Sequence, residues 1–134
     1  MKGVYNSIFL LFSHKLTDAQ VNELKSNGIT SFVYLPSGLQ LLWSNVPPDL
    51  KGLKGYLKPI VEWLKNNAKE GDWVLVQGDF GAVFTVVDFC FQNGLVPVYA
   101  TAKRNTIEEM ENGKLTKVSQ FDHVIFRKYE RWKE

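Results

Sequence analysis

The chain has 134 residues, 45% of them hydrophobic and 13% aromatic, which is enough for one sizeable core, so we expect a single domain over residues 1–134. The formal net charge is only +2, so the overall charge requires neither long DNA or RNA nor a membrane surface as a partner. Cys90 is the single cysteine, which argues against a disulfide framework and favours a reducing compartment. The apolar run at residues 8–12 is too short to span a membrane and lacks the features of a signal peptide, so we expect a cytoplasmic protein.

The N-terminal third of the chain predicts two strands joined by a helix. Residues 5–12 are rich in aromatic and branched side chains, which is typical of a buried strand. Thr17 fits a helix N-cap, and the helix it starts covers residues 19–26 and ends at Gly28. A second strand follows over residues 30–35.

Two apolar stripes with helical spacing come next. The first comprises Leu39, Leu42, Trp43 and Val46, and the second comprises Leu53, Leu57, Ile60, Val61, Leu64 and Ala68. Because Pro59 lies within the second stripe, the second helix is expected either to start near Lys58 or to bend there.

The middle of the chain predicts a third strand at residues 73–77 and a helix from about residue 80 or 81 to residue 93, ended by Gly94. This helix is nearly apolar all round, so more than one of its sides must be covered. A subunit interface and burial within its own domain explain this composition equally well.

The C-terminal third predicts only strands. A fourth strand covers residues 96–100, and residues 106–111 and 114–118 form a hairpin around the two-residue turn Asn112-Gly113. A final strand covers residues 124–129.

Strands that alternate with helices predict an α/β fold: a Rossmann-like, mostly parallel sheet flanked by helices, followed by a C-terminal β-hairpin and a final strand. Ligands of such sheets bind beyond the carboxyl ends of the strands. The residues expected there are Ser13, His14 and Lys15, then Pro36, Ser37 and Gly38, then Gly78, Asp79, Phe80 and Gly81, and finally Thr101, Ala102, Lys103 and Arg104.

The loop from Gly78 to Gly81 joins a strand to a helix N-terminus, where backbone N–H groups can approach an anion closely. The loop is neither a GxGxxG fingerprint nor a Walker A loop. Asp79 either caps the following helix or orients a sugar hydroxyl or an adenine amino group. We assign ligand contacts to Ser37, Gln77, Gly78, Asp79, Phe80, Gly81 and Thr101.

Ser13, His14 and Lys15 offer a hydroxyl, an imidazole and an ammonium at the end of the first strand, a set suited to phosphate chemistry. Lys103 and Arg104 are expected at the same sheet edge, where they would favour a polyanionic ligand. No spacing of His, Cys, Asp and Glu resembles a metal site, so we expect no metal and no cofactor.

Four stretches together resemble a known family: SHKLT at residues 13–17, VQGDFGA at 76–82, YATAKR at 99–104 and FRKY at 126–129. With the LWSNVPPDL stretch, they are similar to the small Csx-type accessory proteins of type III CRISPR systems. The resemblance implies a minimal Rossmann-like (CARF-like) domain that binds a cyclic oligoadenylate second messenger as a homodimer. It also implies a ring nuclease that cleaves this messenger and so switches the CRISPR response off.

In a cyclic oligoadenylate each ribose 2′-OH lies beside the phosphate that it can attack, so cleavage needs positioning, proton transfer and charge stabilisation but no metal. Chemistry assigns His14 to acid or base work, Lys15, Lys103 and Arg104 to phosphate charge, and Ser13 to orientation. The products would be linear oligoadenylates with a 2′,3′-cyclic phosphate. Two alternatives stay open: a protein that binds the ring without cleaving it, and a nucleotide-binding or interaction domain unrelated to CRISPR.

Overall fold

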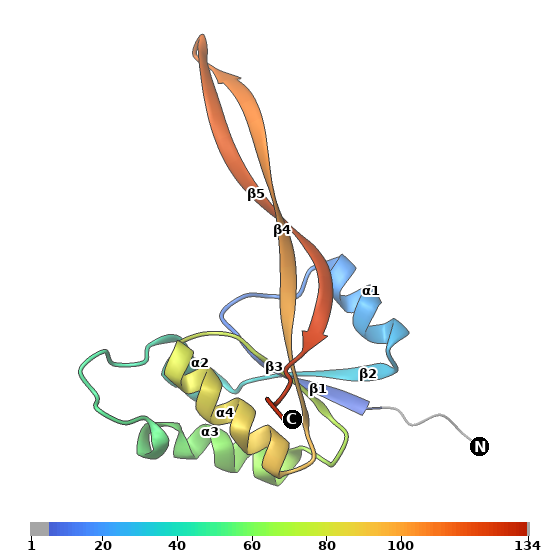
Figure 1. Cartoon of the computed structure of the whole chain (residues 1–134), viewed down its shortest axis with the longest axis vertical. Coiled ribbons are helices and arrows are strands. Elements are labelled where there is room, and N and C mark those ends of the chain that lie inside the picture. The colour runs from blue at the N-terminus through green and yellow to red at the C-terminus, as the bar shows by residue number, and fades with distance from the viewer. Residues whose placement is uncertain (1–5, 134) are drawn as a thin grey trace.

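The structure, a computed structural model, describes residues 6–133 as one sheet with helices on both of its faces (Figure 1). In chain order the elements are β1 (Asn6–Leu11), α1 (Asp18–Ser26), β2 (Ile29–Tyr34), α2 (Ser37–Ser44), α3 (Lys54–Asn67), β3 (Trp73–Val76), α4 (Phe80–Gln92), β4 (Val96–Glu111) and β5 (Lys114–Lys128). No helix within residues 6–133 is long and apolar enough to cross a bilayer.

The five strands lie in the order β2-β1-β3-β4-β5. Neighbouring strands among β2, β1, β3 and β4 run parallel, whereas β5 is antiparallel to β4, so the sheet is mixed. The predicted α/β class, the helices flanking the sheet and the C-terminal hairpin are confirmed. The strand order changes direction between β1 and β3, the position at which ligands of open α/β sheets bind.

Two apolar clusters hold the helices against the sheet. On one face α2, α3 and α4 pack over alternate residues of β1 and β3, including Phe9, Leu11, Val74 and Val76. On the other face Leu24 of α1 packs with Ile8 and Leu10 of β1 and with Phe126 of β5. Because strand side chains alternate between faces, neighbouring residues of β1 serve both clusters.

Most predicted boundaries agree with the structure to within a residue or two. Thr17 caps α1, and its side chain and that of Gln20 form a capping box. Of the two alternatives for the helix that contains Pro59, a start near Lys58 is wrong, because α3 begins at Lys54 and keeps Pro59 inside it. Of the first predicted strand, Tyr5 lies outside the described residues.

The C-terminal strands are longer than predicted, and here the sequence-based boundaries were wrong. The predicted fourth strand and first hairpin strand form one continuous strand, β4, while the second hairpin strand and the final strand form β5. The turn Asn112-Gly113 is confirmed, with φ of 52° and 77°. Beyond a register shift between Ala100 and Ala102, residues 102–111 and 114–123 form a two-stranded ribbon, hereafter the arm, that projects from the body (Figure 1).

Candidate functional site

The carboxyl end of β1 opens into a surface cavity of about 550 Å³. Phe12 is buried beneath it, whereas Ser13, His14 and Lys15 are exposed at its rim. Tyr34, Gln40 and Ser44 complete the lining from the end of β2 and from α2. The structure therefore gathers the three predicted residues of the first strand end around one concave surface.

A polar network from α2 supports Ser13. The Oγ atoms of Ser13 and Ser44 lie 2.9 Å apart. The Gln40 amide donates to Ser44 Oγ over 2.9 Å and to the Phe12 carbonyl over 3.1 Å. Sequence reasoning missed Gln40 and Ser44, although their spacing of four residues on the polar side of a short amphipathic helix was a usable signal.

Aromatic rings form the other wall of the cavity. The Phe12 and Tyr34 rings stack with centroids 6.5 Å apart, and the His14 ring meets Phe12 edge-on at 6.4 Å. The Leu16 N–H donates to the Tyr34 hydroxyl over 3.3 Å, which ties the loop after β1 to the end of β2. The cavity thus combines a flat apolar surface with a hydroxyl, an imidazole and an ammonium, groups that suit a base and a phosphate.

The glycine loop after β3 has a clear packing role. A Cβ on Gly78 would lie 3.1 Å from Nε1 of Trp43, and that nitrogen donates to the Gln77 carbonyl over 2.9 Å. Gly78 therefore lets the indole of α2 lie directly against the backbone of the loop. Asp79 caps α4, because its Oδ2 accepts from the Ala82 N–H over 3.0 Å.

Two other predicted ligand residues are engaged in the sheet. Gln77 Oε1 accepts from the Ala100 N–H over 2.6 Å, across the gap where β3 ends and β4 continues. Thr101 Oγ1 bonds both the carbonyl and the N–H of Ile125 at the irregular pairing of β4 with β5. Their polar groups stabilise the strand ends.

Ser37, Phe80 and Gly81 lie at helix starts. Ser37 is exposed at the first residue of α2, and Phe80, at the first residue of α4, is 95% exposed. A Cβ on Gly81 would lie 3.3 Å from the Leu53 side chain. None of these three lines the cavity at the end of β1.

Lys103 and Arg104 lie in the arm, because β4 does not end at residue 100 as expected. The Arg104 guanidinium donates to Ser119 Oγ from both Nε and Nη2, at 3.1 and 2.9 Å, and lies over the Phe121 ring. Lys103 pairs in register with Asp122. Neither Lys103 nor Arg104 lines the cavity that Ser13, His14 and Lys15 surround.

The two histidines have different surroundings. His123 Nε2 lies 2.6 Å from Glu23 Oε1, and its side chain is 8% exposed. The other oxygen of Glu23 accepts from the Phe126 N–H over 2.7 Å. His123 therefore fastens the root of the arm to α1, while His14 stays at an accessible rim.

A cysteine nucleophile and a metal centre are two further kinds of site to consider. Burial raises the pKa of the Cys90 thiol to about 12, so the nucleophilic thiolate does not form near neutral pH. Within residues 6–133 no three His, Cys, Asp or Glu side chains are grouped so that they could hold a metal ion.

Comparison with known proteins places the chain in a family. A protein of Methanocaldococcus jannaschii, named "Uncharacterized protein MJ1673", is 49% identical over 123 residues, which cover 91% of this chain and 95% of that protein. No solved structure matches the chain. Residues 6–127, a stretch that includes the cavity and the arm, match the family described as "Uncharacterized protein MJ1673 family". The chain therefore belongs to the MJ1673 family.

Proposed function

We propose that this protein binds a cyclic oligoadenylate at the carboxyl edge of its sheet and cleaves it without a metal ion. The observation that carries the proposal is the cavity at the end of β1, where Ser13, His14 and Lys15 stand together beside an exposed aromatic ring. The resemblance of these stretches to Csx-type accessory proteins, and the Rossmann-like and CARF-like architecture that it implies, belong to the same proposal. The proposal also includes a homodimer and a cytoplasmic location, where the enzyme would switch off type III CRISPR signalling.

The chemistry is an internal transesterification. The ribose 2′-oxygen attacks the adjacent phosphorus, the bond from phosphorus to the 5′-oxygen breaks, and a 2′,3′-cyclic phosphate remains on a linear product. One proton leaves the 2′-OH and one reaches the departing 5′-oxygen. His14 carries one of these transfers as base or acid, and water serves the other.

The residues around His14 supply charge and position. The Lys15 ammonium lies next in the chain and stabilises the negative charge that develops on the phosphate oxygens. Ser13, held near Ser44, orients a non-bridging oxygen, and the exposed Tyr34 ring offers a surface on which adenine can stack. Lys103 and Arg104 remain proposed phosphate contacts, which they would make from the arm.

Binding without cleavage is the second candidate, and the placement of the basic pair favours it. With Arg104 bonded to Ser119, the cavity has Lys15 as its one lysine or arginine among the described lining residues. A site with one cation and one imidazole can hold a phosphate and an adenine without accelerating the reaction much. In this second candidate function, the protein binds the ring at the same site but does not cleave it.

Incubation with labelled cyclic tetraadenylate in EDTA separates the two candidates. We expect a linear product with a 2′,3′-cyclic phosphate end under single-turnover conditions. Ring binding without any linear product, with or without added Mn²⁺, would select the binding protein. The absence of both binding and cleavage, with cyclic tetraadenylate and with larger rings, would overturn the proposed function.

A further inference from the structure

The arm carries apolar side chains that its own chain leaves exposed. Ile107 pairs in register with Val118, Met110 pairs with Leu115, and Phe121 follows towards the root. These five side chains are between 41% and 70% exposed. The two pairs lie on opposite faces of the ribbon, because strand side chains alternate between faces. An isolated two-stranded ribbon is only marginally stable in water, so a cover over the arm would stabilise it.

The accessible surface of the chain is large for its mass. A compact monomer of 15.3 kDa exposes about 7,100 Å², whereas this chain exposes 9432 Å². The excess of about 2,300 Å² is greater than the roughly 800 Å² per partner that a standard protein interface buries. The excess is large enough to supply an interface of standard size.

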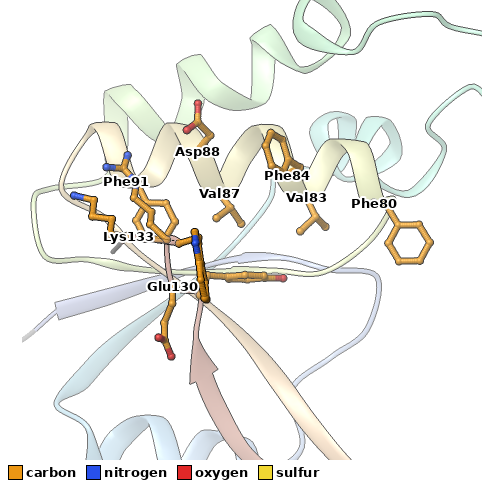
Figure 2. A pocket seen from close by; sticks show the side chains of 11 residues that line it. Phe80, Val83, Phe84, Val87, Asp88, Phe91, Glu130 and Lys133 are labelled. Carbon is orange, nitrogen blue, oxygen red and sulfur yellow. The ribbon is translucent and has the colours of Figure 1, made fainter.

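A second exposed apolar surface lies along α4, in a groove of about 700 Å³ (Figure 2). Its lining residues, hereafter the α4 groove, are Phe80, Val83, Phe84, Val87, Asp88, Phe91, Tyr129, Glu130, Arg131, Trp132 and Lys133. Phe84 and Trp132 are 77% and 91% exposed. Nothing within residues 6–133 covers these rings, and the arm of the same chain points away from α4 (Figure 1).

We propose that the arm of one copy lies in the α4 groove of a second copy, and that the second arm makes the same contact in return. A two-fold axis relates the two contacts, so the groove of each chain covers the face of the partner's arm that carries Met110, Leu115 and Phe121. The reach is sufficient, because each arm strand adds roughly 30 Å at about 3.3 Å per residue. A compact domain of about 100 residues is about 34 Å across, so the arm can span a partner's body.

This contact deepens the homodimer of the proposed function and rests on that part of it, but it does not depend on ring binding or cleavage. The ligand-free protein is therefore sufficient for the test, and a failure of the dimer is distinguishable from a failure of ring cleavage. Sedimentation velocity at micromolar concentration should give twice the chain mass of 15.3 kDa. Met110→Lys at the tip of the arm and Phe84→Lys in the groove should each raise the dimer Kd by about 30-fold or more. Both side chains are exposed in the single chain, so circular dichroism should report an unchanged fold.

Two exposed positions provide matched controls. Thr116→Lys places the same charge on the arm at a polar position, and Leu41→Lys removes an exposed apolar side chain from α2, away from both surfaces. Both should remain dimers with the wild-type Kd.

Mixing the two interface variants tests the reciprocal geometry. A heterodimer of Met110→Lys with Phe84→Lys keeps one intact contact, since the Phe84→Lys chain has a normal arm and the Met110→Lys chain has a normal groove. The mixture should therefore dimerise more tightly than either variant alone. A wild-type monomer, a dimer weakened by only one of the two variants, or a mixture without rescue would each overturn the proposal.

Discussion

The loop after β1 and the root of the arm each carry one of the chain's two histidines, and the surroundings of the two rings differ. His14 lies at the rim of a cavity beside a hydroxyl and an ammonium, whereas His123 is held against Glu23 and nearly enclosed. The first environment leaves an imidazole available to a ligand, and the second uses an imidazole to join a helix to a strand. A histidine's role is therefore set by the partners that the fold brings to it.

The largest effect is expected at His14. If this imidazole transfers a proton during ring cleavage, His14→Ala should lower the single-turnover rate by about 10² to 10⁴-fold with little change in ring affinity. The measurement is the first-order rate of linear product formation with excess enzyme. His123→Ala is the matched control and should cleave at the wild-type rate. Equal losses in both variants would remove the distinction between the two histidines.

The next largest effect should come from Glu23, which holds His123 and the backbone of Phe126 at once. Glu23→Ala leaves the Phe126 N–H without its acceptor, so the free energy of unfolding should fall by about 1–3 kcal/mol. Urea denaturation followed by circular dichroism measures the loss. Glu23→Gln retains an acceptor oxygen and should lose less. An unchanged urea midpoint in Glu23→Ala would show that the arm root does not depend on this carboxylate.

A smaller loss of stability is expected from Gly78→Ala. The new Cβ would lie 3.1 to 3.3 Å from three atoms of the Trp43 indole, so the ring or the loop must shift, at a cost of about 1–2 kcal/mol. Gly38→Ala is the control, because its Cβ meets nothing within 4 Å and it lies in helix α2. Thermal unfolding of both variants gives the comparison. Equal melting temperatures would contradict the close packing of Trp43 on Gly78.

The smallest effect is expected at Ser44. Ser44→Ala removes the hydroxyl near Ser13 and one acceptor of the Gln40 amide, while the cavity keeps its imidazole and ammonium. One neutral hydrogen bond is worth about 1 kcal/mol, so the single-turnover rate should fall by about tenfold or less. A loss as large as that of His14→Ala would transfer the central role from His14 to the Ser13–Ser44 pair.

Sequence periodicity predicted the strands and helices of the body but did not predict the arm. Apolar runs and caps predicted β1, α1 and α4 closely because these elements bury apolar side chains in the core of the same domain. The arm buries neither face, so residues 101–105 and 119–123 show no alternation that predicts a continuous strand. Periodicity likewise did not predict that β4 continues beyond residue 100 and so carries Lys103 and Arg104 in the arm.

The candidate site was predictable where chain neighbours form it. Ser13, His14 and Lys15 follow directly from the end of a buried strand. Gln40 and Ser44 come from a helix beyond the next strand, and their placement depends on how α2 packs. The same holds for Gly78, whose neighbour Trp43 is distant in the chain.

The indole of Trp43, beneath the glycine loop after β3, and the indole of Trp132, in the α4 groove, differ in their exposure to water. Trp43 is 2% exposed and its N–H is bonded to the Gln77 carbonyl, whereas Trp132 is 91% exposed in the α4 groove. Indole emission moves to longer wavelength in water, so Trp132 contributes at the red edge of the fluorescence spectrum and Trp43 at the blue edge. Dimer formation through the groove should therefore appear as a blue shift that Trp132→Phe abolishes, while a ligand at the edge of the sheet should change the intensity of the Trp43 band.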